Sequence, residues 1–135
     1  MIITEILARN RRMYENESAL VEIEPERNRR KEFTWKQFDD QSSQIAQALI
    51  SYGVIKNDRV VQLMMNCIEW LPAYFGILRT GALSVPLNFR FDAKTIEKCI
   101  STAEAKVLIF GEEFIDRINT IKTQLDRYVK TYIFV

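Results

Sequence analysis

The 135-residue sequence contains no histidine and only two cysteines, Cys67 and Cys99. Without histidine, Ser-His and Cys-His catalysis is excluded, and so is the usual general base near neutral pH. The two cysteines stand too far apart for the ligand spacing of a zinc site, and no histidine could complete one. We therefore predict no metal site, and we interpret both cysteines as small buried residues rather than as reactive thiols.

Glycine is also scarce, and its placement excludes several phosphate-binding motifs. The four glycines, at positions 53, 76, 81 and 111, lie too far apart to build a loop whose backbone N–H groups cradle a phosphate. No G-x-G-x-x-G follows a predicted strand, which disfavours a dinucleotide-binding domain. The G-x-S-x-G motif of a nucleophilic serine is absent as well.

Neither long apolar runs nor an excess of charge of one sign is present. The 19 Lys and Arg residues nearly balance the 18 Asp and Glu residues, so the net charge of +1 creates no field that would attract nucleic acid. The apolar runs are far too short to span a bilayer, and the opening MIITE leads into a charged segment rather than a signal peptide. We predict no nucleic-acid partner and no membrane span, and we expect a cytoplasmic protein.

The most regular part of the chain is a strand, helix, strand unit. Residues 59–64 form a short apolar, β-branched run that is typical of a buried strand. Residues 69–80 carry apolar side chains at helical spacing, with Pro72 in the first turn and Gly81 at the C′ position. Residues 83–87 form the second strand. A crossover of this length predicts a parallel, right-handed βαβ unit.

A helix is predicted immediately before this unit, from Thr34 to Gly53. Thr34 and Gln37 have the spacing of a capping box, in which each side chain bonds the backbone N–H of the other residue. Gly53 ends the helix, because a left-handed residue is most easily accommodated there. The apolar face of the helix comprises Phe38, Ile45, Leu49 and Tyr52.

The first 33 residues predict a helix and a small β-hairpin. Residues 4–14 are expected to be helical with Thr4 as the cap, and residues 19–24 alternate as in an edge strand. The charged link 25–31 is expected to join this strand to another that ends at Phe33. We interpret the basic side chains of the link as a solvated loop, rather than as a site for nucleic acid or CoA phosphates. These side chains are Arg27, Arg29, Arg30 and Lys31.

The helix and strand pattern repeats after residue 88. Asp92 can cap a helix, residues 106–110 predict a strand, apolar residues between 114 and 125 predict a helix, and residues 132–135 predict a strand. The predicted fold class is α/β, a parallel doubly wound sheet of about four βα units preceded by the helix and hairpin. We predict a single domain or subdomain over residues 1–135, with a lead-in over 1–33 and a helix plus βαβαβαβ core over 34–135.

Candidate binding residues lie in the loops at the carboxyl ends of the strands, where ligands bind in such sheets. These loops are residues 65–67, 88–90 and 111–113. Asn66, Asn88 and Arg90 are the candidate cofactor-binding residues, because amides donate and accept hydrogen bonds and a guanidinium pairs with carboxylate or phosphate. Turn formation or helix capping is the alternative for the asparagines. Glu112 and Glu113 could only repel an anion, and no catalytic residue is predicted.

A recognisable order of residues runs through nearly the whole chain. It comprises FTW at 33–35 and Phe38, then Gly53, Asp58, Arg59, Val60, Asn66, Cys67, Glu69 and Trp70, then AYFGILRTGA, VPLN and AKVLI. This order and spacing resemble the N-terminal part of the AMP-forming acyl-CoA synthetases. That superfamily also includes the adenylation domains of peptide synthetases and firefly-type luciferases. The chain departs from much of the family at Phe89, where a proline is usual.

The resemblance implies an ATP-dependent acid–thiol ligase, for example one of fatty acid metabolism. A carboxylate attacks the α-phosphate of ATP to give acyl-AMP and pyrophosphate, and the thiol of CoA then displaces AMP. Magnesium offsets the charge of the phosphates. The resemblance therefore implies ATP, Mg²⁺ and CoA as cofactors of the intact enzyme, and a small carboxylic acid and CoA as its partners.

The motifs that the family uses to hold ATP are absent from this sequence. There is no Ser/Thr/Gly-rich loop ending in Pro-Lys-Gly, and no later acidic and lysine motifs. We expect the chain to be an N-terminal fragment of the family's large domain, and the bare apolar run at 132–135 favours this interpretation. The fragment alone is expected to bind no cofactor tightly and to be inactive.

Two other functions stay open at this point. One is an adenylation domain that loads a carrier protein, and the other is a free-standing, non-catalytic α/β binding or regulatory module. A receiver-like module would need an acidic cluster at a strand end, whereas Met65 and Asn66 follow the first predicted strand of the sheet. A homodimer also stays open, but a truncated sheet face can associate artificially, so a dimer of this chain alone would say little about the intact protein.

Overall fold

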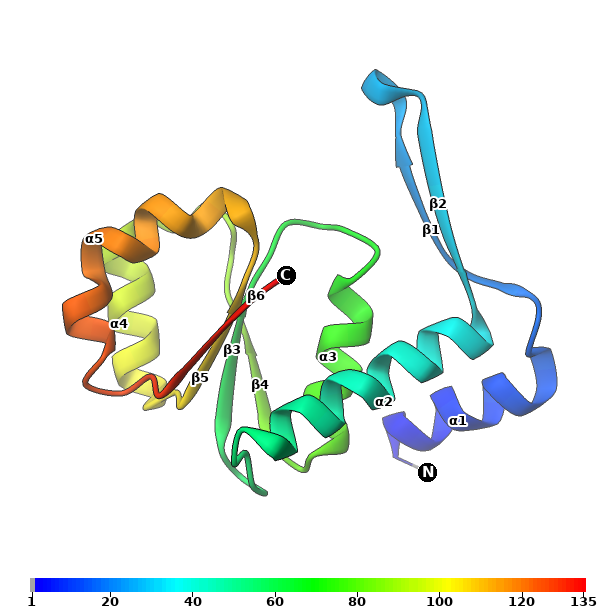
Figure 1. Ribbon diagram of the computed structural model, residues 1–135, viewed down its shortest axis with the longest axis horizontal. Helices are drawn as coiled ribbons and strands as arrows, with labels where there is room; N and C mark the ends of the chain where they lie inside the picture. Colours follow the sequence, from blue (N-terminus) through cyan, green and yellow to red (C-terminus); the bar gives the residue numbers. More distant parts are fainter. Residues whose placement is uncertain (1) are drawn as a thin grey trace.

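The computed structural model describes residues 2–135 and confirms the predicted α/β class (Figure 1). A four-stranded parallel sheet has the strand order β4-β3-β5-β6, and β1 and β2 form a separate antiparallel hairpin. The elements are α1 (Ile3–Tyr14), β1 (Ser18–Glu24), a short 3-10 helix (Pro25–Arg27), β2 (Arg29–Thr34), α2 (Trp35–Ser51), β3 (Arg59–Leu63), α3 (Trp70–Arg79), β4 (Leu83–Pro86), α4 (Ala93–Ala103), β5 (Val107–Phe110), a second 3-10 helix (Glu112–Phe114), α5 (Ile115–Leu125) and β6 (Thr131–Phe134).

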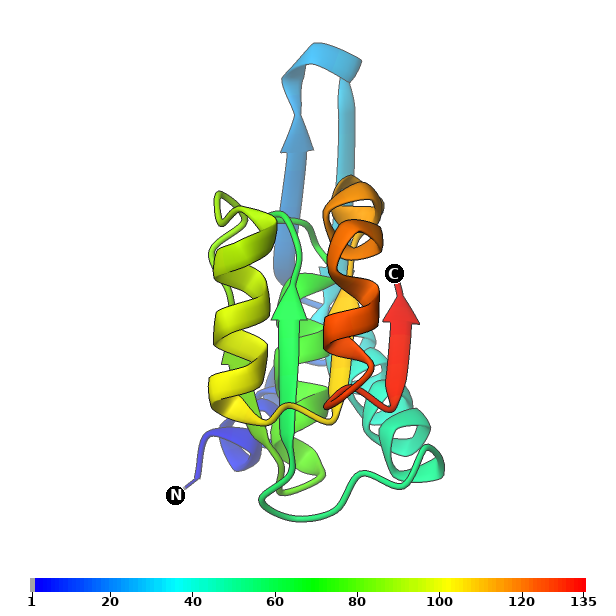
Figure 2. The same ribbon diagram turned by 90° about the vertical axis from the view of Figure 1, so that its left-hand side faces the viewer.

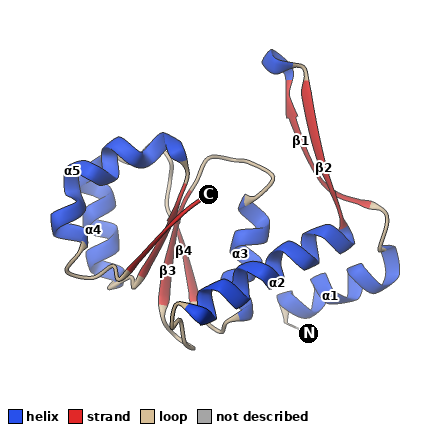
Figure 3. Ribbon diagram, viewed as in Figure 1, coloured by secondary structure: helices blue, strands red, loops and turns tan. Residues whose placement is uncertain are grey.

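Helices cover both faces of the parallel sheet, as a doubly wound fold requires. Helices α4 and α5 lie on one face and α2 and α3 on the other, with α1 packed outside α2 (Figures 1 and 2). The hairpin projects away from this layered body (Figure 3). Among residues 2–135, no helix is both long enough and apolar enough to cross a membrane.

Two apolar cores flank the sheet because successive strand residues point to opposite faces. Val61 packs toward α4 and α5, whereas its neighbour Val60 packs toward α2 and α3. The first core includes Val61, Leu63, Ile96, Ile100, Leu108, Phe114, Ile118 and Leu125. The second includes Leu49, Val54, Val60, Met64, Ala73, Ile77, Val107 and Ile109. The central strands β3 and β5 are therefore buried on both sides, which is why their sequences are largely apolar.

The capping residues of two helices were predicted correctly. Thr34 Oγ1 accepts from the N–H of Gln37 at 3.2 Å, and the Gln37 side chain accepts from the N–H of Thr34 at 2.8 Å. Asp92 Oδ1 accepts from the N–H of Thr95 at 2.8 Å and begins α4. Gly81, just beyond α3, has φ +80°, the left-handed conformation that the C′ position favours.

Three local expectations were wrong. Thr4 does not cap α1, because the helix begins at Ile3 and the Glu5 carboxylate instead accepts from the N–H of Ile2. Tyr52 lies past the last residue of α2 and is 59% exposed rather than packed in the core. The predicted link over 25–31 is shorter, because Asn28 adopts a left-handed conformation after one 3-10 turn and lets β2 begin at Arg29.

Helices α1, α2 and α3 are joined by a buried carboxylate. Asp39 on α2 is 5% exposed and receives hydrogen bonds from the guanidinium groups of Arg79 on α3 and Arg11 on α1. Arg79 also donates to the backbone oxygen of Asp39 at 2.9 Å and to Ser43 Oγ at 2.8 Å. A buried charge needs such partners, so this network fixes the three helices relative to one another.

Candidate functional site

The strand order places a topological switch point between β3 and β5. The chain leaves β3 for β4 on one side and then returns past β3 to form β5 on the other side. Leu63 and Phe110, the last residues of the two strands, are paired in register, and the N–H of Gly111 donates to the oxygen of Leu63. In open α/β sheets, ligands bind in the crevice that opens at such a point. The loops that follow β3 and β5 are therefore the centre of the candidate site.

A pocket of about 760 Å³ opens at this switch point. Two of the three predicted loops meet there, since residues 65–67 and 111–113 both line the pocket, whereas residues 88–90 do not. The remaining wall comes from the β1–β2 hairpin, which was not predicted to take part. The structure thus joins an N-terminal element to the carboxyl ends of the central strands.

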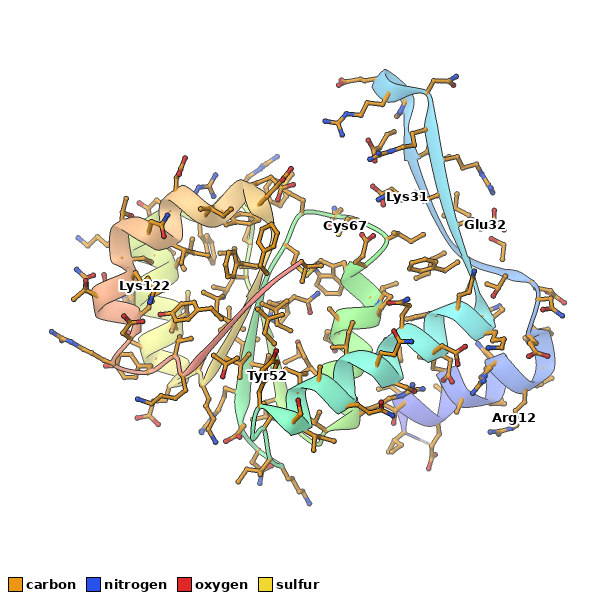
Figure 4. All side chains as sticks on the ribbon, in the orientation of Figure 1. Arg12, Lys31, Glu32, Tyr52, Cys67 and Lys122 are labelled. Carbon is orange, nitrogen blue, oxygen red and sulfur yellow. The ribbon has the colours of Figure 1, made fainter. Side chains whose placement is uncertain are left out.

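Glu22 and Lys31 hold the hairpin against the loop between β3 and α3. The Glu22 carboxylate accepts a hydrogen bond of 2.9 Å from the backbone N–H of Ile68. Lys31 Nζ lies 3.7 Å from a carboxylate oxygen of Glu69 and 4.0 Å from one of Glu22. Figure 4 shows Lys31 on the hairpin side that faces the loop carrying Cys67, with Glu32 on the other side. The only sequence signal for this contact was the alternation that places Glu22 on the same side of β1 as Leu20.

The charges around the pocket are largely paired, and negative charge is in excess. Glu24 accepts two hydrogen bonds from Arg29, the shorter at 2.7 Å, and this contact lowers the pKa of the Glu24 carboxyl. Six carboxylates face three cations around the lining. The carboxylates are Glu22, Glu24, Glu26, Glu69, Glu112 and Glu113, and the cations are Arg27, Arg29 and Lys31. The pocket of this chain alone is therefore unfavourable for a polyphosphate.

Cys67 lies in the pocket wall, but its thiol is a poor nucleophile. Burial, and after it the neighbouring Glu69 carboxylate, which disfavours the thiolate, together raise its pKa to about 11. The reactive species is the thiolate, so the thiol of Cys67 is largely unreactive at neutral pH. The interpretation of this cysteine as a packing residue agrees with that environment.

The three candidate binding residues lie in different surroundings. Asn66 is exposed and lines the pocket, and its side chain has no hydrogen-bond partner among residues 2–135. The Asn88 side chain accepts a hydrogen bond of 2.9 Å from the N–H of Arg90, so it forms a turn after β4. Arg90 is exposed and lies over the ring of Phe89, with its guanidinium carbon 5.4 Å from the ring centroid. Ligand binding by these residues stays a prediction.

Arg117, which the sequence analysis did not single out, fastens the loop after β4. Its guanidinium donates to the backbone oxygens of Phe89 and Phe91 at 2.7 and 3.1 Å and lies over the ring of Phe114. The donors come from α5, 26 to 28 residues further along the chain. This contact fixes the backbone of the loop at Phe89 and Phe91.

Comparison with known proteins identifies what the chain resembles over nearly its full length. A family description named AMP-binding enzyme matches residues 7–134. Long-chain-fatty-acid–CoA ligase FadD13 of Mycobacterium tuberculosis is 32% identical over 93 residues, which cover 69% of this chain and 18% of the relative. Butyrate–CoA ligase AAE11, peroxisomal, of Arabidopsis thaliana is 34% identical over 96 residues, which cover 71% and 17%. The chain therefore spans less than a fifth of the length of these relatives.

Solved structures show the same similarity in three dimensions. The N-terminal domain of FACL13 from Mycobacterium tuberculosis matches with a TM-score of 0.88 and 28% identity, covering 100% of this chain and 34% of that chain. The anthranilate CoA ligase AuaEII in complex with anthranoyl-AMP also matches with a TM-score of 0.88 and 28% identity, covering 98% and 24%.

Proposed function

This chain belongs to the AMP-binding enzyme family, and from that premise we propose that it contributes part of the large domain of an ATP-dependent acid–thiol ligase. The product is an acyl-CoA. The observation that carries the proposal is the family match over residues 7–134, which includes both loops of the pocket at the β3/β5 switch point.

The reaction that we propose has two steps. The carboxylate of the acid attacks the α-phosphate of ATP and forms acyl-AMP with release of pyrophosphate. The sulfur of CoA then attacks the acyl carbonyl, and AMP leaves. Both steps need charge on phosphate to be offset. Residues 2–135 offer no group of three or more His, Cys, Asp or Glu side chains arranged to hold a metal ion. We therefore assign no metal-holding role to these residues.

The role that we assign to the chain itself is structural support and one wall of the binding crevice. Asn66 presents an amide with free donors and acceptors to the pocket, and Arg90 presents a cation at the carboxyl end of β4. A phosphate of CoA or of the nucleotide is the group that Arg90 would pair with. The acidic excess of the pocket and the lack of a phosphate-loop motif in the sequence support the proposal that the 135 residues alone catalyse neither step.

We base our proposals for the acid substrate and the acceptor on the relatives. Similar proteins include ligases named for long-chain fatty acids, butyrate, and 3- and 4-hydroxybenzoate, all with CoA as the acceptor. We propose CoA as the acceptor and a carboxylic acid as the substrate, with straight-chain fatty acids as the first class to try. The test is acid-dependent pyrophosphate release by the native protein that carries this chain. Absence of release for fatty, short-chain and aromatic acids alike would overturn the proposal.

A further inference from the structure

A fully buried glutamine lies in the central strand of the sheet, next to the loop that lines the pocket. Gln62 is 0% exposed, and every other residue of β3 after Arg59 is apolar. Because side chains alternate along a strand, Gln62 points to the same face of the sheet as Val60, toward α2 and α3. Its side chain therefore lies on the side of the helix to which the β3–α3 loop, residues 64–69, leads.

The amide group of Gln62 is bonded to the first residue of that helix. Its Nε2 donates to the backbone oxygen of Trp70 at 2.8 Å and lies 3.6 Å from Met64 Sδ. Only the NH₂ group of an amide can donate to a carbonyl, so this contact determines which way the side chain is turned. The bond joins β3 to the start of α3, eight residues later in the chain, and closes the loop between them.

The carbonyl end of the same amide has no partner. Gln62 Oε1 is buried and accepts no hydrogen bond within residues 2–135. A buried acceptor of this kind destabilises a fold, whereas a methionine of similar length would fill the space without that cost. The Trp70 oxygen does not depend on the bond either, because a carbonyl in the first turn of a helix already accepts within the helix. Overall stability therefore does not explain an amide at this position.

The loop that this bond closes carries a candidate binding residue. Asn66 is exposed and lines the pocket at the β3/β5 switch point. The hairpin holds the loop from one side, where the Glu22 carboxylate accepts from the N–H of Ile68. Gln62 holds the loop from the sheet, at the end where α3 begins. The loop is thus fixed between two side chains that come from different layers of the fold.

We propose that Gln62 is a positioning residue of the pocket. Through the backbone oxygen of Trp70 it sets the conformation of the β3–α3 loop, and thereby the position at which Asn66 meets a ligand. Rigid support of this kind is what keeps a binding side chain in its productive geometry. The effect on the loop does not depend on the reaction, whereas any effect on catalysis rests on the proposed ligase function.

Hydrogen exchange of the native protein that carries this chain, measured by mass spectrometry, tests the effect on the loop. Gln62→Met removes the donor and keeps a side chain of similar size. We expect about tenfold faster exchange in peptides covering residues 64–70, the effect of losing one ordinary hydrogen bond, and unchanged exchange in β5. Ser84→Ala is the matched control. Ser84 Oγ is also buried without a partner among residues 2–135, on the same face of the neighbouring strand, and makes no bond to the loop.

Three results of this experiment would overturn the proposal. The first is unchanged exchange of the loop in Gln62→Met, and the second is an equal increase in Ser84→Ala. The third is an increase that is as large in β5 as in the loop, because it would mean that Gln62 supports the whole sheet and not the loop in particular.

A double-variant cycle in the same protein tests whether Gln62 acts through Asn66. The KM values for ATP, the acid and CoA are measured for Gln62→Met, for Asn66→Ala and for the double variant. Gln62→Met should raise the same KM as Asn66→Ala by at least about threefold, and by less than about twofold once Asn66 is alanine. An equal effect in both backgrounds, or no effect of Asn66→Ala on any KM, overturns the positioning role. A native protein without pyrophosphate release contradicts the proposed function instead, and the exchange experiment then decides the role of Gln62 by itself.

Discussion

The carboxylate of Glu22, on β1, accepts a hydrogen bond of 2.9 Å from the backbone N–H of Ile68, just before α3 begins. The two residues are 46 positions apart, and Ile68 is 5% exposed. Ile68 precedes Glu69, the N-cap of α3, and a negative acceptor is favourable this close to a helix N-terminus. This one contact therefore joins the hairpin to the loop that carries Asn66, and it defines the shape of the pocket.

Replacing Glu22 by alanine should loosen the hairpin and the β3–α3 loop together. The buried N–H of Ile68 would lose its partner, which costs about 1–3 kcal/mol for a buried donor. We expect faster hydrogen exchange at the amide of Ile68 and in β1 and β2, measured by NMR or mass spectrometry. Glu22→Gln keeps an acceptor and should have a smaller effect. Unchanged exchange in Glu22→Ala would contradict the role assigned to this contact.

Removing the buried charge of Asp39 should destabilise the packing of the first three helices. Asp39→Ala leaves the guanidinium of Arg79, whose side chain is 17% exposed, without its carboxylate. Breaking such a pair by removing one partner costs about 3–5 kcal/mol. Urea unfolding measures this loss. The control is Glu32→Gln, which removes an ion pair with Arg30 at the surface and should cost less than about 1 kcal/mol. Equal losses in the two variants would contradict this account.

Cys67 should react slowly with iodoacetamide, and its rate should rise steeply with pH. Its pKa is raised to about 11 by burial and by Glu69, so only a small fraction is thiolate near pH 8. Glu69→Gln removes a negative charge, which lowers the pKa and should speed alkylation several-fold at pH 8. Rates are measured in a Cys99→Ser background. Glu113→Gln removes another carboxylate of the same pocket and should leave the rate unchanged; an equal increase there would contradict the assignment to Glu69.

The Asp92 cap should make part of the stability depend on acid pH. Hydrogen bonds from Thr95 lower the pKa of this carboxyl below its ordinary value of 3.8. A lowered pKa means that its stabilisation is fully present above that value and is lost as pH falls through the lower pKa of the folded state. Asp92→Asn keeps a capping acceptor but does not titrate, so its stability should fall less on acidification. Parallel acid unfolding curves for the two proteins would contradict this.

The sequence was sufficient to predict those features of the structure that depend on residues close together in the chain. The capping box of Thr34 and Gln37, the Asp92 cap and the glycine after α3 all act over three or four residues, and all were predicted. The alternation of parallel strands and helices was predictable for the same reason, because the apolar pattern of each segment depends on how that segment itself is buried.

Strand order and the composition of the pocket could not be predicted in this way. The position of β5 next to β3, and not next to β4, depends on packing across the whole sheet, and no local sequence pattern predicts it. The hydrogen bond of Glu22 depends on where the hairpin packs against Ile68, which is 46 residues later in the chain. The hydrogen bonds of Arg117 depend on where α5 packs against the loop after β4. Periodicity and capping motifs therefore do not predict long-range contacts of charged side chains.

The measurement that tests the central claim most directly is acid-dependent release of pyrophosphate from ATP by the native protein that carries these residues. We predict release with at least one acid from a panel of fatty, short-chain and aromatic acids, followed by a CoA thioester and AMP when CoA is added. The 135-residue chain produced alone should release none. A folded native protein that releases no pyrophosphate with any acid of the panel would contradict the assignment as a ligase, and release by the chain alone would contradict its assignment as an incomplete site.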